Sequence, residues 1–161
     1  MHVETLGALF AGALLSGVIP AVNAELLVMG YAVMVAPAAV PLVAAVSTLG
    51  QMTSKTFLFA LARWSPARLP ARAHAAIARA AEKVRSRAGT TRSTIFASAA
   101  LGFPPFYGVS LVSGALGVRT RTFVGMGTLG RLVRFSVLAW GANQLGVHGV
   151  RSFLHATLLG G

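Results

Sequence analysis

The sequence predicts an all-α integral membrane protein, and two observations carry that prediction. Of its 161 residues, 55% are hydrophobic and only 11% are charged, and the mean hydropathy is +0.73, which is too apolar for a soluble globular domain of this size. The apolar residues also form long runs interrupted by proline, as expected of helices that enter or cross a bilayer. We expect a single membrane domain over 1–161, with two similar halves that each contain a re-entrant helical hairpin and a transmembrane helix.

Composition also excludes several classes of function. The chain has no cysteine and only three acidic residues, Glu4, Glu25 and Glu82, so disulfides, thiolate chemistry and paired-carboxylate hydrolysis are not expected. The histidines lie in predicted termini and loops, and we expect neither an enzyme nor a metal or cofactor site. The net charge of +11 is explained more simply by cytoplasmic loops facing anionic lipid than by nucleic-acid binding.

The first half begins with a hairpin broken by proline. An apolar run over 6–19 stops at Pro20 and resumes over 26–36, and neither part alone has the roughly 20 residues that a crossing needs. We therefore expect the chain to enter the membrane and return to the same side, with the turn packed inside the protein. Asn23 is placed to cap the second helix, and Glu25 then lies in its first turn, where the helix dipole favours an anion.

A transmembrane helix over 42–62 completes the first half, which extends over 5–62. The segment has the length of a membrane span. Its polar residues recur at the spacing of one helical face: Ser47, Gln51, Ser54 and Lys55. We expect this polar stripe to face the protein interior.

Residues 63–93 form a basic linker that is rich in arginine, contains lysine and has one acidic residue, Glu82. By the positive-inside rule this linker is cytoplasmic. The arginine- and alanine-rich composition is also typical of a GC-rich bacterial sequence, so we expect a bacterial inner membrane protein. The alanine-rich middle, 71–88, is predicted to be a basic amphipathic helix lying on the inner leaflet.

The second half, over 94–147, repeats the same order. Its apolar run over 94–118 is interrupted by Pro104 and Pro105, which break a helix, so we expect a second re-entrant hairpin that enters from the cytoplasmic side. A transmembrane helix over 122–147 follows.

That last span carries Arg131 and Arg134 about one third of the way along, and ionisable residues inside a membrane indicate a functional site. The tail, 148–161, is predicted to be a short interfacial helix. Three alternatives stay open. The last span can begin after Arg134, residues 6–36 can form one kinked span, and the first apolar run can be a signal peptide, although Glu4 stands where a basic residue is expected.

Two short patterns recur in the same order in both halves. A proline is followed ten residues later by glycine, and the triplet Thr-Leu-Gly then opens the long span. The first pattern is Pro20 with Gly30 and Pro104 with Gly114, and the second covers 48–50 and 128–130. The basic linker between the halves implies that they have opposite orientations. An inverted repeat with broken helices is a transporter architecture whose site lies at the repeat interface.

Four charged residues are expected at similar depth. At about 1.5 Å of rise per residue, Glu25, Lys55, Arg131 and Arg134 all fall roughly 12 to 20 Å from the nearest segment end, close to the middle of a bilayer. One carboxylate cannot neutralise three cations, so the predicted cavity carries about two surplus positive charges. A phosphate group matches the fork of arginine. We therefore expect a phosphate-bearing substrate here, with Gln51 and Asn23 as further polar contacts.

With these residues identified, the chain resembles a short member of the DedA (VTT-domain) superfamily of membrane proteins. The resemblance rests on three segments, PAVNAE over 20–25, TLGQMTSK over 48–55 and GRLVRF over 130–135. It implies the double re-entrant fold and the transbilayer movement of lipids, either phospholipid scrambling or recycling of the carrier undecaprenyl phosphate. It also implies functional roles for Glu25, Arg131 and Arg134. Unlike typical members, the chain has no arginine over 100–110.

The function that these observations favour is a lipid transporter, a flippase or scramblase, that moves an anionic lipid between leaflets. Proton coupling through Glu25 is a secondary hypothesis, because apolar surroundings disfavour a charged carboxylate. The alternatives are a small-solute or drug exporter with a cavity lined by Phe103, Phe106 and Tyr107, and a structural membrane protein. The expected partners are membrane lipids and not nucleic acid, and homo-oligomerisation is left open.

Overall fold

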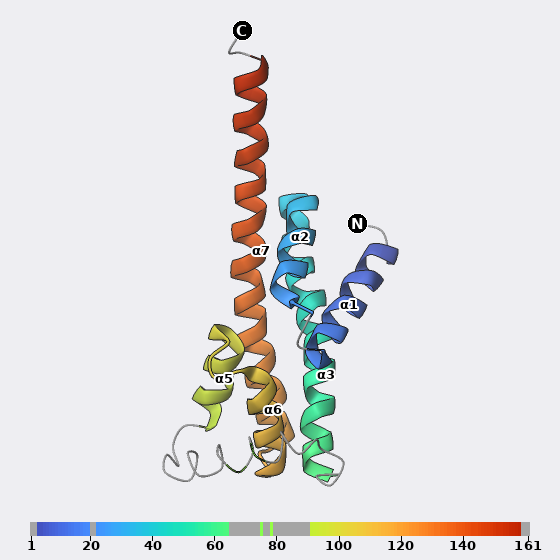
Figure 1. The fold of residues 1–161 in the computed structure, drawn as a ribbon, viewed down its shortest axis with the longest axis vertical. Helices are drawn as coiled ribbons and strands as arrows, with labels where there is room; N and C mark the ends of the chain where they lie inside the picture. The colour runs from blue at the N-terminus through green and yellow to red at the C-terminus, as the bar shows by residue number, and fades with distance from the viewer. Residues whose placement is uncertain (1–2, 20–21, 65–74, 76–77, 79–90, 159–161) are drawn as a thin grey trace.

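The computed structural model describes residues 3–19, 22–64, 75, 78 and 91–158, with side chains described as far as residue 146. Every regular element within these residues is a helix, so the all-α prediction is confirmed. Figure 1 shows the elements in order. They are α1 (Val3–Val18), α2 (Ala24–Met34), the short 3₁₀ helix η1 (Pro37–Ala39), α3 (Val40–Trp64), α5 (Thr91–Leu101), α6 (Phe106–Ala115) and α7 (Thr120–Leu158).

The basic linker predicted over 63–93 is helical at both ends, since α3 continues to Trp64 and α5 begins at Thr91. The amphipathic helix predicted over 71–88 falls almost entirely outside the described residues. The same is true of Pro20, the predicted break in the first hairpin.

Helices α1 and α2 form the first hairpin. Figure 1 shows α1 descending from the N-terminus and α2 returning toward the level at which α1 began. Asn23 caps α2 as predicted, because its Oδ1 accepts a hydrogen bond from the backbone N–H of Glu25 at 2.8 Å. The alternative of one kinked helix over 6–36 is wrong, because the chain reverses direction between two separate helices.

Helices α5 and α6 form the second hairpin, with Pro104 and Pro105 in its turn. After α5 ends, Gly102 adopts a φ of +80°, a conformation that glycine adopts without steric cost. Pro105 is the N-cap residue of α6, where the absence of its N–H costs nothing. The Ser98 hydroxyl donates to the Pro104 carbonyl at 2.5 Å and ties the turn back to α5.

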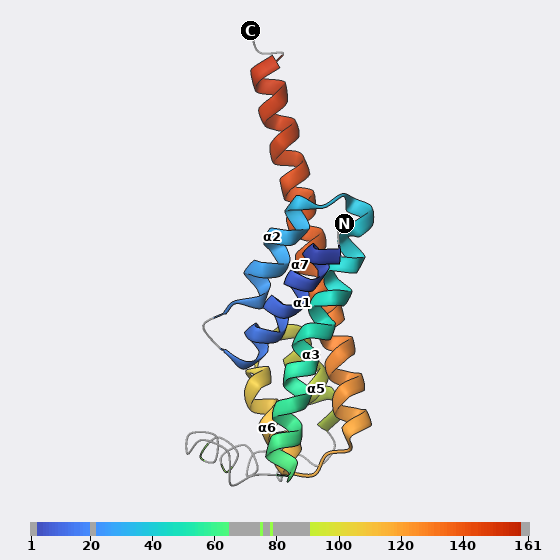
Figure 2. The same ribbon diagram turned by 90° about the vertical axis from the view of Figure 1, so that its right-hand side faces the viewer.

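The two long helices, α3 and α7, pack against each other, and the helices of both hairpins pack on these two. The first helix of each hairpin packs on the long helix of its own half, α1 on α3 and α5 on α7. The second helix crosses over, so that α2 packs on α7 and α6 packs on α3. Figures 1 and 2 show that the end of α1 and the start of α2 lie at about the same level as the end of α5 and the start of α6, between the two ends of α3.

Glycine allows the close approach of helices within each half. A Cβ atom added at Gly50 of α3 would lie 2.5 Å from the Phe10 carbonyl oxygen of α1 and 2.9 Å from the Ala13 Cβ. A Cβ atom added at Gly130 of α7 would lie 2.7 Å from the Phe96 carbonyl oxygen of α5 and 2.6 Å from a Cβ atom there. Both glycines belong to the repeated Thr-Leu-Gly triplet, so the triplet serves the same packing contact twice.

The polar stripe of α3 faces the protein interior as predicted. Its four members, Ser47, Gln51, Ser54 and Lys55, are each at most 5% exposed. Apolar clusters lie on either side of them, one joining α1, α2, α3 and α7 and another joining α3, α5, α6 and α7. The stripe is therefore enclosed between the two hairpins.

Helix α7 is longer than predicted. A transmembrane helix over 122–147 and a separate interfacial helix over 148–161 were expected, but α7 continues without interruption to Leu158, so the expected boundary is wrong. The segment contains no proline, and none of its residues has a positive φ that would end the helix. Figure 1 shows the end of α7 extending beyond the other helices. Among the described helices, none combines the length and the hydropathy needed to cross a membrane.

Candidate functional site

The charged residues predicted to form the site meet at the two hairpin tips, by which we mean the end of α1 with the start of α2, and the end of α5 with the start of α6. Glu25 is in the first turn of α2. Lys55 is on α3, and Arg131 and Arg134 are on α7. The long helices thus supply the cations and the first hairpin supplies the carboxylate.

Arg134 contacts both tips. Its Nε and Nη2 donate to Oε1 of Glu25, with the Nε distance at 3.1 Å, and the two side chains form an ion pair. Its Nη1 donates to the backbone carbonyl of Ala100, near the end of α5, at 3.0 Å. One guanidinium therefore joins α2 to α5.

The turn of the second hairpin is fitted to this guanidinium. A Cβ atom added at Gly102 would lie 3.1 to 3.2 Å from the Arg134 guanidinium atoms. Gly102 is thus required both for its positive φ and for the space that Arg134 occupies.

Lys55 also contacts both tips. Its Nζ donates to the backbone carbonyl of Gly17, near the end of α1, at 2.6 Å. The same Nζ lies 5.1 Å from the ring centroid of Tyr107, in the first turn of α6. Lys55 and Arg134 thus have similar roles, since each cation binds a carbonyl at the C-terminus of a hairpin helix, where the helix dipole is negative.

Of the three cations in the cluster, Arg131 is the one without a hydrogen bond to another described residue. Its side chain is only 8% exposed, and its Nε has no hydrogen-bond partner. The guanidinium carbon lies 5.0 Å from the ring centroid of Phe106 and 5.7 Å from that of Phe135. Cation–π contacts of this kind offset only part of the cost of removing a guanidinium from water.

Electrostatic interactions link the four charges. Lys55 and Arg131 repel each other, Arg131 is repelled by Arg134, and Arg131 is attracted to the carboxylate of Glu25. Since Arg134 already forms an ion pair with that carboxylate, the positive charges of Lys55 and Arg131 are not balanced by any described acidic group in the cluster.

The other predicted site residues lie around this cluster. Gln51, one turn before Lys55, donates from Nε2 to the Ser16 hydroxyl at 3.1 Å, while its Oε1 has no partner. Asn23 is exposed and caps α2 by accepting hydrogen bonds from the backbone N–H groups of Glu25 and Leu26, and no described hydrogen bond joins it to the charged groups. Pro104 and Pro105 form the second turn.

The aromatic residues expected to line an exporter cavity do not share one position. Phe106 is buried against Arg131, and Tyr107 is half-buried beside Lys55. Phe103, by contrast, is 80% exposed. Two of these aromatic residues therefore belong to the charged cluster instead of to a separate apolar lining.

Several residues of the site were not identified from the sequence. The carbonyls of Gly17 and Ala100 accept hydrogen bonds from the cations, and backbone carbonyls leave no signal in a sequence. The position of Gly102 directly before Phe-Pro-Pro was an available signal, because glycine before a turn often supplies a positive φ. Asn143 on α7 donates to the carbonyls of Ala32 and Val35 and holds the end of α2.

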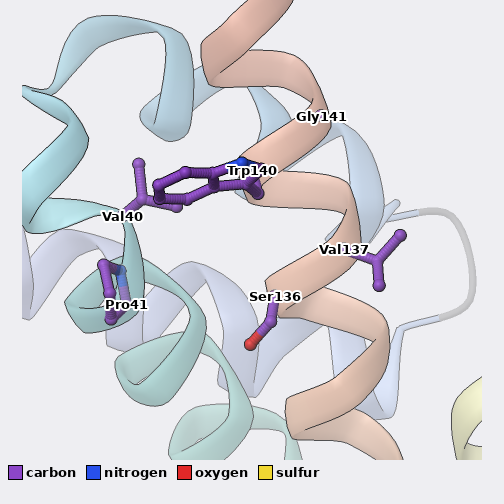
Figure 3. A pocket seen from close by; sticks show the side chains of 6 residues that line it. All are labelled: Val40, Pro41, Ser136, Val137, Trp140 and Gly141. Atoms are coloured by element: carbon purple, nitrogen blue, oxygen red, sulfur yellow. The ribbon is translucent and has the colours of Figure 1, made fainter.

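The molecule also has a groove that lies apart from the charged cluster. The groove is open, has a volume of about 480 Å³ and lies between the start of α3 and the middle of α7. Figure 3 shows that the Trp140 ring extends toward Val40 and Pro41 there. Ser136 is the one hydroxyl among its lining residues, which also include Val137 and Gly141. None of the predicted site residues lines this groove.

Comparisons with family models, with curated proteins and with solved structures find no match for this chain. Within the described residues, no group of His, Asp or Glu could hold a metal ion. The resemblance to the DedA superfamily therefore rests on the three short motifs of the sequence alone.

Proposed function

We propose that this chain is a membrane transporter of the bacterial inner membrane that moves an anionic, phosphate-bearing lipid between leaflets. The observation that carries the proposal is the meeting of Lys55, Arg131 and Arg134 with a single carboxylate, Glu25, at the hairpin tips. The cluster has a surplus of two positive charges. Such a surplus is costly in an apolar surrounding unless water or an anion attends it.

The distribution of side chains supports a membrane location. Serine, glutamine, asparagine, lysine and arginine side chains are buried in the interior, whereas large apolar side chains cover the outside. Exposed apolar residues include Leu15, Leu26, Val33, Met34, Leu42, Leu49, Phe57, Leu101, Phe103, Leu129, Val133, Val137, Trp140 and Leu145. Soluble monomers rarely expose apolar surface on this scale, and lipid is the environment in which it is stable.

An inverted-repeat architecture is supported by matching contacts in the two halves. Gly50 meets α1 as Gly130 meets α5. Thirteen residues beyond each glycine, Arg63 and Asn143 donate to backbone carbonyls just after the crossed-over helices, to Val118 at 2.7 Å and to Val35 at 2.9 Å. The crossed packing also matches between the halves, since α2 packs on the long helix of the second half, α7, and α6 packs on that of the first half, α3. Broken helices that meet near the midplane of such a repeat are typical of transporters.

The chemistry of the cluster suits a lipid head group. Arginine presents N–H donors in a fork that matches two oxygens of a phosphate, and the partner hairpins bring helix ends to the same place. We propose that the head group passes through this polar centre while its acyl chains remain in the surrounding lipid. The head group would replace water as the counter-charge of the cations.

Glu25 is also our candidate for proton coupling. It faces Arg134, with which it forms the ion pair, and Arg131, to which it is attracted. Protonation of its carboxylate would remove the negative partner of Arg134 and weaken the contact between α2 and α7. Transport that depends on pH in the wild type and no longer does so in Glu25→Gln supports this role, and unchanged pH dependence contradicts it.

The proposed function is tested in proteoliposomes that contain the full chain and a fluorescent phosphatidic acid. Chemical quenching of the outer leaflet reports the rate at which the lipid changes sides. We expect the wild type to move the lipid. The rates of Glu25→Ala and Arg131→Ala should be close to the rate in protein-free vesicles. Arg121→Gln serves as the matched control, because Arg121 is exposed on the same helix, α7. Equal rates in all four proteins would contradict the proposal.

A further inference from the structure

The two hairpins differ in the charge at the start of their second helix. Helix α2 carries its own anion, since Glu25 is its second residue and Asn23 caps its N–H groups. Helix α6 has Tyr107 as its second residue and no acidic residue in its first turn. Its N-cap residue, Pro105, makes no side-chain capping bond. The positive end of α6 therefore lacks the internal anion that α2 has.

The first-turn N–H groups of α6 are free of intrahelical partners. The first hydrogen bond of the helix runs from the N–H of Val109 to the carbonyl of Pro105 at 3.2 Å, so the N–H groups of Phe106, Tyr107 and Gly108 precede it. A Cβ atom added at Gly108 would meet no atom within 4 Å. The side of the helix at Gly108 is therefore open.

Two buried cations lie against the same turn. Arg131, more than nine-tenths buried, has its guanidinium 5.0 Å from the ring centroid of Phe106, and its Nε has no hydrogen-bond partner among the described residues. The Lys55 Nζ, also buried, lies 5.1 Å from the ring of Tyr107. An unpartnered buried guanidinium at the positive end of a helix indicates that an anion belongs there.

We infer that the N-terminus of α6, Arg131 and Lys55 form an oxyanion subsite that binds a phosphate group, while the Glu25–Arg134 pair joins the hairpins and does not bind the anion. This inference rests on the proposed function and deepens it, since it assigns the head group to the second hairpin. In this arrangement Glu25 is the internal counter-charge of the first hairpin, and the ligand phosphate is the counter-charge of the second. The two halves are then electrostatically equivalent when the ligand is bound.

Binding is measured on the purified full chain in detergent by ³¹P NMR, with inorganic phosphate in one arm and dihexanoyl phosphatidic acid in the other. We expect Arg131→Gln and Lys55→Gln each to weaken binding by about tenfold or more. The control Arg121→Gln should change it less than about twofold, because an exposed cation is screened by solvent. Binding of both ligands, or of the lipid alone, supports the subsite when it depends on Arg131. Absence of binding, or equal binding by wild type and Arg131→Gln, overturns it.

A second measurement separates a ligand subsite from a structural role. Without ligand, Arg131→Gln should melt at the same temperature as the wild type or higher, because the variant loses a buried cation that has no polar partner. Added phosphatidic acid should raise the melting temperature of the wild type and not that of the variant. A variant that melts lower without ligand would mean that Arg131 holds the fold together, and the inference would be wrong.

These results are independent of transport. Phosphate binding that depends on Arg131, in a protein that moves no lipid in vesicles, would leave the subsite in place and refute the proposed function. If the protein moves lipid but binds phosphate equally well with and without Arg131, the proposed function would stand and the subsite would be refuted.

Discussion

Arg134 of α7 and Glu25 of α2 form an ion pair although they are 109 residues apart in the chain. The same guanidinium donates to the Ala100 carbonyl of α5, so a single side chain connects both hairpins to one long helix. Lys55 of α3 has the corresponding position between Gly17 and Tyr107. The core of the protein is thus held together by cations that contact helix ends from both halves.

The contribution of the ion pair is measured by a double-mutant cycle. We expect the effects of Glu25→Gln and Arg134→Gln on the free energy of unfolding to be non-additive, with a coupling energy of about 1 kcal/mol, because the Glu25 carboxylate is partly exposed. Denaturant unfolding in detergent provides the free energies. A parallel cycle of Glu25→Gln with Arg121→Gln should be additive. Additivity in both cycles would show that the pair has no energetic role.

The two triplet glycines should be equally intolerant of a side chain. Gly50→Ala and Gly130→Ala would each place a Cβ within 2.5 to 2.9 Å of atoms in the neighbouring helix, and we expect each to lower the free energy of unfolding by about 1 to 3 kcal/mol through overpacking. Gly125→Ala, on the same helix as Gly130 with no atom within 4 Å of the added Cβ, should be neutral or slightly stabilising. Thermal unfolding of the three variants checks this prediction. A loss of stability in Gly125→Ala as large as in the other two would mean that these helices are sensitive to any glycine substitution, and not specifically at the close helix contacts.

Gly102 offers a test of the contact between the second turn and Arg134. Gly102 and Gly117 both have a positive φ, but only at Gly102 would a Cβ approach another residue, namely the Arg134 guanidinium. Gly117→Ala should therefore lower the free energy of unfolding by about 1 kcal/mol, because alanine is strained in the left-handed conformation. Gly102→Ala should lower it further and also disturb the ion pair between Arg134 and Glu25. Equal losses of stability would argue against a packed guanidinium at the turn.

Asn143 should stabilise the end of α2. Its Nδ2 donates to the carbonyls of Ala32 at 2.7 Å and Val35 at 2.9 Å, and the residue is 1% exposed. We expect Asn143→Ala to lower the free energy of unfolding by about 2 kcal/mol, because two helix-end carbonyls lose their donor in a buried position. Gln144→Ala, at the neighbouring half-buried position, is the control and should have a much smaller effect.

The sequence contained most of the information needed for the elements. Proline breaks between short apolar runs predicted two helical hairpins, Asn23 predicted a helix start, and the spacing from Ser47 to Lys55 predicted a buried polar face. These features are local, so their physical causes act within a few residues. The end of the last helix was missed, because an amphipathic pattern over 148–161 does not by itself stop a helix without proline.

The pairing of charges could not be predicted to the residue. Arg131 and Arg134 lie less than one helical turn apart, and only the position of α2 decides that Arg134 reaches Glu25 while Arg131 packs against two phenylalanine rings. The carbonyls of Gly17 and Ala100 were equally invisible, since every residue has one. The crossing of α2 onto α7 and of α6 onto α3 is a tertiary relation that a short repeat only suggests.

The depth of the hairpin tips in the bilayer decides whether the charged cluster lies within the membrane. The chain has no cysteine, so single spin labels can be placed in lipid vesicles at Ile19→Cys and Phe103→Cys, which are exposed at the two tips, and at Met34→Cys and Trp64→Cys, which are exposed at the ends of α2 and α3. The tip labels should collide with dissolved oxygen far more than with a water-soluble nickel complex, as at the bilayer centre, and the end labels should show the reverse. Tip labels that are as accessible to nickel as the end labels would contradict this arrangement, because the charged cluster would then not lie within the membrane.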